Sequence, residues 1–295
     1  MNIVISINCK YIFPAKIMLF SLSENCREEL NIYCLHNELS ENNIKDFSEF
    51  IERKCHGKLY PINMGNKYNN FPLSLSHISK ETYFRLDAVN LLPDSIERFL
   101  YLDSDIIVLG NLSEFYHQPF GDKLIVASPD YLSRGEEHPA LTELKKNNIN
   151  FVDGHIYFNA GMILFNAAKI RDVFAENDIN KYVEPYKDKL KYMDQDILNI
   201  MYSGNVKYNE SRNYNFQITH MDKFDLSDEK YKEIFILHFI CKVKPWNYRY
   251  RNEAKWIFWQ YARICGYRRK YVIFKVINPL CCFLMKIVLR ILRLS

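Results

Sequence analysis

The residues with the clearest chemical potential are Asp103 and Asp105, two carboxylates that follow an apolar run over 99–102. That run is short, aromatic and aliphatic, and a second apolar run follows at 106–108, which predicts a buried strand that ends at the first carboxylate. An ionised carboxylate at the end of a buried strand is costly unless it is paired. Two of them at this spacing can bind one divalent cation through oxygen. A solvated turn is the alternative, since Asp and Ser are common turn residues.

Strands and helices alternate in the first part of the chain, and these elements would position the pair. We expect strands over 2–8, 31–36 and 58–62, with helices over 14–25 and 40–54 between them. This alternation predicts an α/β fold with a mostly parallel central sheet. Ligands of such sheets gather at the carboxyl ends of the strands. Asn8 and Asp103 would both lie at that edge.

The second half of the chain carries further polar residues at predicted element ends. We expect a helix over 80–91, a long loop over 130–154 that could form a lid, and a strand over 156–165 interrupted by Asn159-Ala160-Gly161. Helices are expected over 167–176 and 178–190, and another begins near Asp194; short strands are expected over 123–127, 206–208 and 234–238. His238 would follow the last of these strands, and imidazole is a common ligand of borderline metals beside carboxylate.

Composition and cysteine usage place the chain among ordinary globular proteins. It has 295 residues, of which 48% are hydrophobic and 25% are charged, which suits one large domain or two small ones. Its eight cysteines form no C-x-x-C pair. The short apolar run at the N-terminus has no basic residue before it and is read as a strand rather than a signal peptide. We therefore expect a cytoplasmic protein with reduced thiols.

The basic residues are concentrated at the C-terminus. The net charge is +4, but nine basic residues and no acidic ones follow Glu253, so the rest of the chain is acidic. In 280–294, Lys286, Arg290 and Arg293 share one helical face in an apolar surround. The longest uncharged stretch of the tail, 276–285, is too short for a bilayer core of ~30 Å. The pattern over 280–294 favours a helix lying on an anionic membrane surface. A helix packed on the body or on another subunit is the alternative. The acidic body argues against a nucleic-acid partner.

Several ordered blocks occur together, and with them the chain resembles glycosyltransferase family 8, especially its bacterial lipopolysaccharide galactosyl- and glucosyltransferases. The likeness runs from about residue 2 to about residue 247, over the blocks 83–86, 101–105, 110–112, 157–162, 194–199 and 238 with 244–246. It implies a GT-A fold with a Rossmann-like nucleotide-binding half, as a catalytic domain over 1–250 followed by a membrane-associating tail over 251–295. It also implies retaining transfer of galactose or glucose from a UDP-sugar to a lipid-linked saccharide at the inner face of the cytoplasmic membrane.

The resemblance assigns roles to individual residues. The metal, Mn²⁺ or else Mg²⁺, would be held by Asp103, Asp105 and His238, and Arg85, Asp194 and Gln195 would lie at the reaction centre. The expected donor-binding residues are Ser6, Asn8, Tyr11, Arg85, Asp103, Ser104, Asn159, Ala160, Asp194, Gln195 and Lys244. Weaker candidates for acceptor contact are Asp130 and Asp153. Structural alternatives stay open for several of these residues. Asp194 could be a helix N-cap, and Arg85 could pair with Glu81 on a helix surface. Asn159-Ala160-Gly161 could form a bulge or turn, Lys244 could be a solvated surface residue, and His238 could be an ordinary core or surface histidine.

One departure from the family pattern affects the nucleotide base. The family usually has acidic residues at the end of the first strand, and they meet the uracil ring, whereas this chain has Asn8-Cys9 there. The amide of Asn8 can still donate and accept hydrogen bonds, and Tyr11 can stack. The rival functions are a non-catalytic membrane-associated binder of sugar nucleotides and a transferase with another donor sugar or another acceptor.

Overall fold

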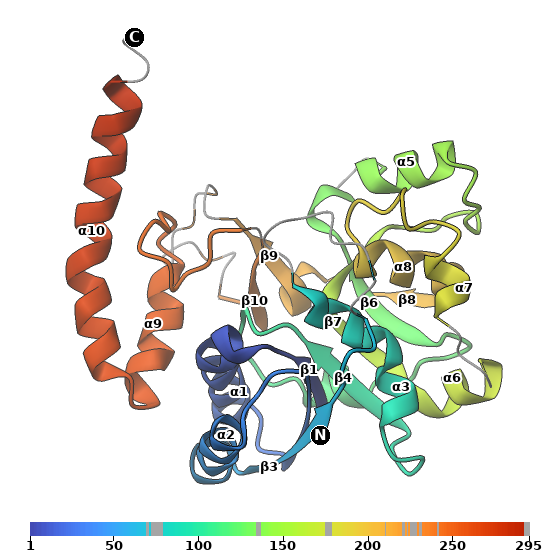
Figure 1. The fold of residues 1–295 in the computed structure, drawn as a ribbon, viewed down its shortest axis with the longest axis horizontal. Helices are drawn as coiled ribbons and strands as arrows, with labels where there is room; N and C mark the ends of the chain where they lie inside the picture. The colour runs from blue at the N-terminus through green and yellow to red at the C-terminus, as the bar shows by residue number, and fades with distance from the viewer. Residues whose placement is uncertain are drawn as a thin grey trace.

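The computed structural model describes residues 1–68, 71, 79–133, 137–174, 179–209, 211–219, 222, 224, 229, 232–240 and 242–291. Its centre is a 7-stranded sheet in the order β3-β2-β1-β4-β7-β6-β8 (Figure 1). The strands are β1 (Asn2–Ser6), β2 (Leu30–His36), β3 (Gly57–Asn63), β4 (Arg98–Leu102), β6 (Ile125–Pro129), β7 (Phe158–Asn166) and β8 (Val206–Tyr208). Only β7 runs antiparallel to its neighbours, β4 and β6. The predicted α/β fold with a mostly parallel sheet is therefore confirmed.

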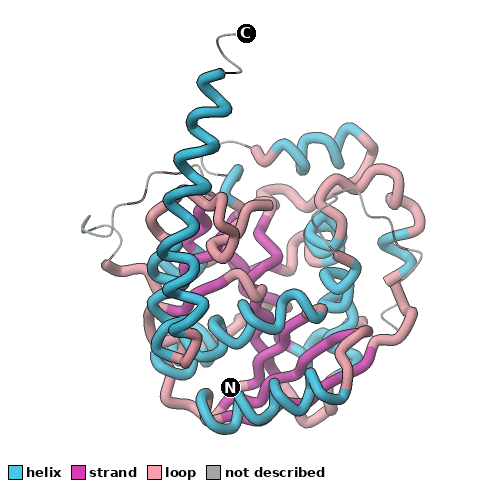
Figure 2. The backbone as a smooth tube through the Cα atoms, turned by 60° about the vertical axis from the view of Figure 1, so that its left-hand side comes forward, coloured by secondary structure: helices cyan, strands magenta, loops and turns pink. Residues whose placement is uncertain are grey.

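Helices cover both faces of this sheet (Figure 2). Ile3 and Ile5 of β1 face the core shared with α1 (Ile12–Asn25) and α2 (Glu41–Lys54), whereas Val4 faces the opposite core. The second core contains the 3-10 helix η2 (Lys80–Asp87) with α3 (Ala88–Leu91), α6 (Ala167–Val173), α7 (Asn180–Val183) and α8 (Asp194–Met201). A strand buried on both faces is expected to be apolar throughout. The first strand fits this expectation, because it lies between β2 and β4 and buries Ile3, Val4 and Ile5.

A second, 3-stranded sheet adjoins the main one and completes the candidate site. It consists of β5 (Ile106–Val108), β10 (Ile236–Phe239) and β9 (Phe216–Ile218), in the order β5-β10-β9. The antiparallel pair β5–β10 places His238 opposite Ile106. Because Ile106 directly follows Asp105, this register brings the imidazole next to the two aspartates. The remaining helices of the body are α4 (Ser113–His117), α5 (Pro139–Lys146) and the 3-10 helices η1 (Cys9–Tyr11), η3 (Tyr131–Ser133) and η4 (Arg212–Asn215).

Four sequence expectations are wrong in detail. The predicted helix over 80–91 is a 3-10 helix up to Asp87. The expected long loop over 130–154 contains α5, which begins with a proline and is capped by the side chain of His138. The strand that includes Asn159 is continuous as β7, but its pairing with β6 is irregular there: Ala127 pairs with Ile163 and Pro129 with Phe158, so the extra residues between these pairs lie on β7. In the described part of 178–190, only Asn180–Val183 is α-helical. The helix expected over 40–54 is confirmed as α2, and the side chain of Ser40 caps it by accepting from the main-chain N–H of Asn43.

The C-terminal segment forms two helices beside the body (Figure 1). The first, α9 (Lys255–Ile264), packs against α1 and buries Trp259 in the same core. The second, α10 (Arg268–Ile291), lies alongside α9 and buries Phe274, while its end extends beyond the body. Within the described residues, no helix combines the length and the apolar character needed to cross a membrane. The side chains of Lys286, Arg290 and Arg293, which carried the membrane prediction, lie outside the described residues.

Candidate functional site

A cleft opens at the carboxyl ends of β1 and β4, where the two sheets meet. It gathers every residue that the sequence predicted for donor binding, catalysis or metal binding, namely Ser6, Asn8, Tyr11, Arg85, Asp103, Ser104, Asp105, Asn159, Ala160, Asp194, Gln195, His238 and Lys244. The cleft is also lined by Glu81 and Gly161, which were not predicted to bind anything. The two predicted acceptor residues, Asp130 and Asp153, are absent from this lining. The polar side chains come from both sheets, so the cleft depends on the assembled fold.

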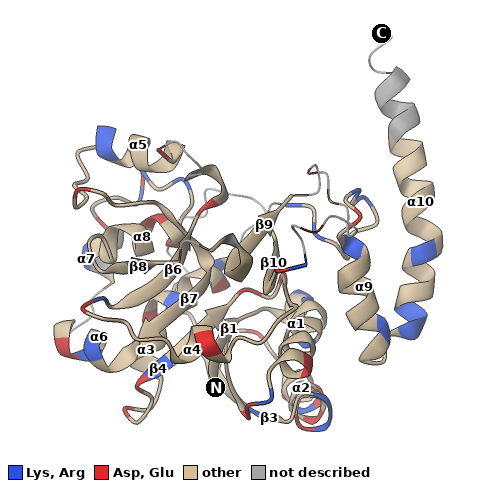
Figure 3. Cartoon of the chain, turned by 180° about the vertical axis from the view of Figure 1, so that it is seen from behind, with Lys and Arg blue, Asp and Glu red and all other residues tan. Residues whose placement is uncertain are grey.

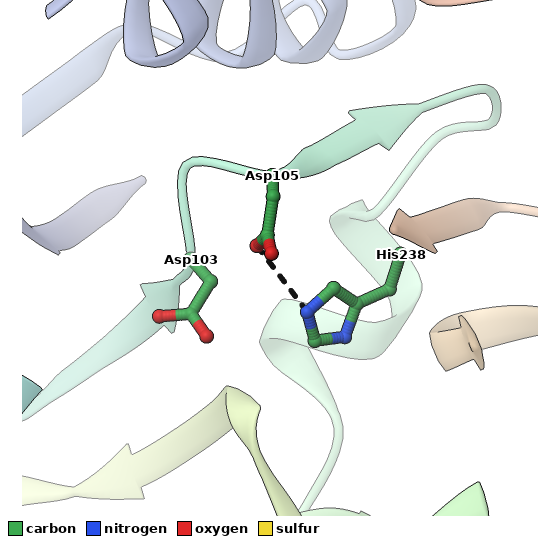
Figure 4. A group of neighbouring side chains, drawn as sticks. All are labelled: Asp103, Asp105 and His238. Atoms are coloured by element: carbon green, nitrogen blue, oxygen red, sulfur yellow. Dashed lines mark ion pairs between the residues drawn. The ribbon is translucent and has the colours of Figure 1, made fainter. Parts of the chain in front are cut away.

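Three potential metal ligands converge at one end of the cleft (Figure 4). One ligand atom from each of Asp103, Asp105 and His238 lies within 4.8 Å of the others. Nε2 of His238 is 3.3 Å from Oδ1 of Asp105. Two carboxylates with one imidazole form a donor set that suits Mn²⁺ and related divalent cations. These residues therefore fit the metal that the sequence predicted.

The carboxylate of Asp105 lies between Lys244 and His238. Burial would raise the pKa of this carboxyl, but Lys244 and His238 outweigh burial and lower it well below its usual range. Nζ of Lys244 donates to Oδ2 of Asp105 and, at 2.8 Å, to the main-chain oxygen of Phe239. The ammonium group thus lies beside the metal ligands, where a diphosphate bound to a cation would also lie.

Asn215 orients the predicted histidine ligand, a role that no sequence pattern indicated. Its Oδ1 is 3.0 Å from Nδ1 of His238, and its Nδ2 donates to Oδ1 of Asn159 at 3.1 Å. Because the amide nitrogen is committed to Asn159, the imidazole must donate from Nδ1. That tautomer leaves Nε2 free to bind a metal. Asn215 lies on η4, and only the tertiary fold brings it to the site.

We expect Asn215→Ala to weaken Mn²⁺ binding roughly 10–100-fold, the usual cost of losing such an orienting partner. The substitution removes the acceptor that fixes the ring of His238. The matched control is Asn213→Ala, in the same 3-10 helix but outside this hydrogen-bond network. Calorimetric titration of both variants with Mn²⁺ in the presence of UDP measures the effect, and equal affinities would contradict the assigned role.

Arg85 joins the metal end of the cleft to the sugar-binding candidates. Nη2 donates to Asp103 at 2.9 Å, Nε lies 3.0 Å from Oδ2 of Asp194, and Nη1 donates to the main-chain oxygen of Ala160 at 2.6 Å. Burial opposes the charge, but Asp103, Tyr101 and Asp194 raise the pKa of the guanidinium above its ordinary value. The alternative of a surface pair with Glu81 is wrong, because Arg85 is buried and its partners are these two aspartates.

Asp194 and Gln195 begin α8 and face the cleft. Burial raises the pKa of Asp194 to about 6, although Arg85 acts in the opposite direction. Asp194 is the first residue of α8 and the N-cap position is occupied by Met193, so the N-cap alternative is wrong. Oε1 of Gln195 accepts from the main-chain N–H of Ala160 at 3.0 Å, and Nε2 donates to Asp130 at 3.2 Å. The carboxamide is therefore held in one orientation.

Asp130 lies behind Gln195, whereas Asp153 lies in an exposed turn. Oδ1 of Asp130 is 3.2 Å from Nε2 of His138, and Oδ2 accepts from Asn159 at 3.2 Å as well as from Gln195. The hydrogen bonds from His138 and Asn159 lower the pKa of this carboxyl against the opposing effect of burial. Acceptor contact by Asp130 and Asp153 stays a prediction, while the contacts of Asp130 indicate that it positions Gln195.

We expect Asp130→Asn to reduce the turnover number for UDP-sugar hydrolysis by roughly 10–100-fold with a smaller change in KM, because small misplacements of a reacting group are costly. Asn would offer a donor where Gln195 needs an acceptor. Asp153→Asn serves as the control and should leave hydrolysis unchanged. Hydrolysis is measured without an acceptor, so a residue that only binds the acceptor would leave it unaffected, and that result would contradict the positioning role.

Comparison with solved structures identifies the class of protein. The crystal structure of the galactosyltransferase LgtC in complex with donor and acceptor sugar analogs superposes with a TM-score of 0.75 at 26% identity, over 92% of this chain and 100% of that chain. The Streptococcus pneumoniae glycosyltransferase GlyE has a TM-score of 0.63 at 20% identity, covers 88% of this chain and 59% of its own, and supports the fold alone. The fold is that of the GT-A glycosyltransferases.

The sequence comparisons then show the family. The pattern of Glycosyl transferase family 8 matches residues 2–249, and the chain belongs to that family. The lipopolysaccharide 1,3-galactosyltransferase of Salmonella typhimurium is 31% identical over 173 residues, which are 56% of this chain and 49% of that protein. The lipopolysaccharide 1,2-glucosyltransferase of Escherichia coli K12 is 24% identical over 255 residues, 84% of this chain and 73% of that protein. The chain thus spans about half to three quarters of these curated relatives.

Proposed function

We propose that this chain is a retaining, metal-dependent hexosyltransferase that moves galactose or glucose from a UDP-sugar to a lipid-linked saccharide such as lipopolysaccharide. The observation that carries the proposal is the single cleft in which Asp103, Asp105 and His238 adjoin Lys244 and the Arg85–Asp194 pair. Family membership and the named activities of the relatives support the choice of sugar and acceptor.

The contacts suggest a division of labour within the cleft. A bound divalent cation, Mn²⁺ in this proposal, supplies positive charge to the departing diphosphate. Lys244 adds a second positive charge at the same place, and Arg85 holds Asp103 and Asp194 in position. Asp194 and Asn159 offer acceptors and donors to sugar hydroxyls. Gln195 lies beside the reacting carbon, and because a carboxamide is a weak nucleophile, a same-face displacement is as suitable as a covalent route.

Turnover of a panel of UDP-sugars tests this proposal. The purified chain is incubated with UDP-galactose, UDP-glucose and UDP-N-acetylgalactosamine, with Mn²⁺ and with a chelator, and release of UDP is measured. We expect slow hydrolysis of one UDP-hexose that stops when the chelator is added. Metal-dependent binding of UDP without transfer or hydrolysis of any donor would instead favour a non-catalytic binder.

We further propose that residues 1–250 form the catalytic domain and that residues 251–295 hold it on the inner face of the cytoplasmic membrane. One side of α10 is an exposed apolar stripe that contains Val272, Val276, Leu280 and Phe283, each more than 50% exposed. The charged residues in the described part of α10 are all basic (Figure 3). An apolar stripe bordered by basic side chains is typical of helices that bind anionic membrane surfaces.

We expect the double substitution Leu280→Glu with Phe283→Glu to abolish sedimentation with vesicles that contain phosphatidylglycerol, because it places two negative charges in the apolar stripe. Donor hydrolysis in solution should not change, since the stripe lies outside the cleft. Val173→Glu, at a position that is 56% exposed on α6, is the matched control. Equal sedimentation of the double variant and the control would contradict the membrane proposal.

A further inference from the structure

Glu81 is a buried carboxylate in the cleft that no cation neutralises. It belongs to η2, is 8% exposed and lines the cleft. Across the described residues, no Lys, Arg or His forms an ion pair with it. Its hydrogen bond in the structure is a long one, 3.4 Å between Oε2 and Nδ2 of Asn8. Arg85, four residues further on, is fully engaged with Asp103 and Asp194.

A buried carboxylate of this kind destabilises the fold unless it has a further partner. A buried carboxylate costs free energy unless it is paired or hydrogen-bonded. A carboxylate has acceptor sites for about four hydrogen bonds, and one long bond leaves most of them unused. Two other carboxylates of the same cleft, Asp103 and Asp194, both pair with Arg85. Glu81 is therefore arranged to accept a hydrogen bond from a ligand.

The position of Glu81 indicates which part of a bound nucleotide it would contact. Its contact with Asn8 places the carboxylate at the end of β1, whereas Arg85 contacts the metal ligand Asp103. In a 3-10 helix the rise is ~2 Å per residue, so these two positions are separated by about 8 Å along η2. If the diphosphate of a nucleotide lies at Asp103, Asp105 and Lys244, the base lies away from this metal-binding end of the cleft. The β1 end of the cleft is the place available for the base.

We propose that Glu81 recognises the base of the donor nucleotide by accepting the N3–H of uracil. This inference rests on the proposed function, because it assumes that a nucleotide occupies the cleft. It accounts for the neutral Asn8 at the end of β1: the negative charge comes from η2, 73 positions further along the chain, and the amide of Asn8 holds it. Uracil presents a donor at N3, whereas cytosine presents a lone pair there that a carboxylate would repel.

A ligand that lacks the hydrogen tests the proposal on the unaltered protein. Binding of UDP, N3-methyl-UDP, CDP and GDP is measured by calorimetry in the presence of Mn²⁺. We expect N3-methylation to weaken binding roughly 10–100-fold, since it removes a hydrogen bond to a charged acceptor and leaves that acceptor buried. CDP should be discriminated against to a similar degree.

A variant tests whether Glu81 is the residue that causes the loss of affinity on N3-methylation. We expect Glu81→Gln to bind UDP roughly 10–100-fold more weakly and to show a smaller preference for UDP over CDP, because the new amide can donate to cytosine N3. Glu143→Gln, an exposed glutamate on α5, is the matched control. Metal-dependent binding of UDP that tolerates N3-methylation would overturn the assignment and leave the proposed function standing. Tighter binding of GDP than UDP would overturn the choice of uracil. If no nucleotide binds, both the function and this assignment fail.

Discussion

Asp105→Asn is expected to lower metal-dependent turnover of the UDP-sugar by roughly 10²–10³-fold, because it removes a charged ligand from the centre that stabilises the leaving diphosphate. The side chain keeps its shape but loses the negative charge that attracts a cation. The carboxamide also keeps only one oxygen, whereas the carboxylate has Oδ1 near His238 and Oδ2 bound to Lys244. Both the metal and the ammonium group would therefore be held less well.

The measurement is UDP release as a function of Mn²⁺ concentration, combined with calorimetric binding of Mn²⁺. We expect a lower maximum rate and a weaker apparent affinity for the metal. Asp188→Asn changes an exposed aspartate in the turn before α8 and should behave as the unaltered protein. Turnover of Asp105→Asn at the normal rate in the presence of a chelator would show that the three-residue cluster is not a catalytic metal site.

The main features of the site could be predicted because they are encoded locally. An apolar strand followed by Asp103 and Asp105, and an apolar run that leads to His238, marked these polar residues as candidates. The carboxyl end of β4 lies at the edge of the main sheet where ligands gather, and β10 of the second sheet supplies His238. The prediction of the metal cluster needed no knowledge of how β5 pairs with β10. The pairing in turn gives the cluster its compact geometry.

The residues that the sequence did not reveal act through contacts between distant segments. Asn215 is 23 positions from the histidine that it orients, and Glu81 is 73 positions from Asn8. No periodicity or spacing links such pairs. Asp130 was noticed as a carboxylate, but its contacts with His138, Asn159 and Gln195 come from three different segments. Its place behind Gln195 therefore required the fold. The helix α5 was missed for another reason, because its start signal stood in a region without clear periodicity.

Gly161 has a packing role that the sequence did not indicate. The small residues of Asn159-Ala160-Gly161 predicted a break in the strand where a ligand could approach the backbone. The strand β7 is continuous, although its pairing with β6 is irregular at these residues, and its glycine has no positive φ. The groups that approach the backbone are side chains of the protein. A Cβ atom on Gly161 would lie 2.8 Å from Oδ2 of Asp103 and 2.9 Å from Nε2 of His238, and nearer still to Cε1 of that ring.

Gly161→Ala is therefore expected to weaken Mn²⁺ binding by at least 10-fold and to reduce UDP-sugar turnover by roughly 10²-fold, because displaced ligands lose their alignment. The added methyl group must push Asp103 and His238 apart, and Arg85 restrains Asp103 from the other side.

Ala127→Gly on the adjoining strand β6 is the control for altered strand propensity. Calorimetric titration with Mn²⁺ and thermal unfolding are compared for the two variants. A variant with normal metal affinity would show that the ligands can move aside. A loss of thermal stability without a loss of metal affinity would place the strain in the strand. A selective loss of metal binding in Gly161→Ala would show that the absence of a side chain at this position is part of the metal site.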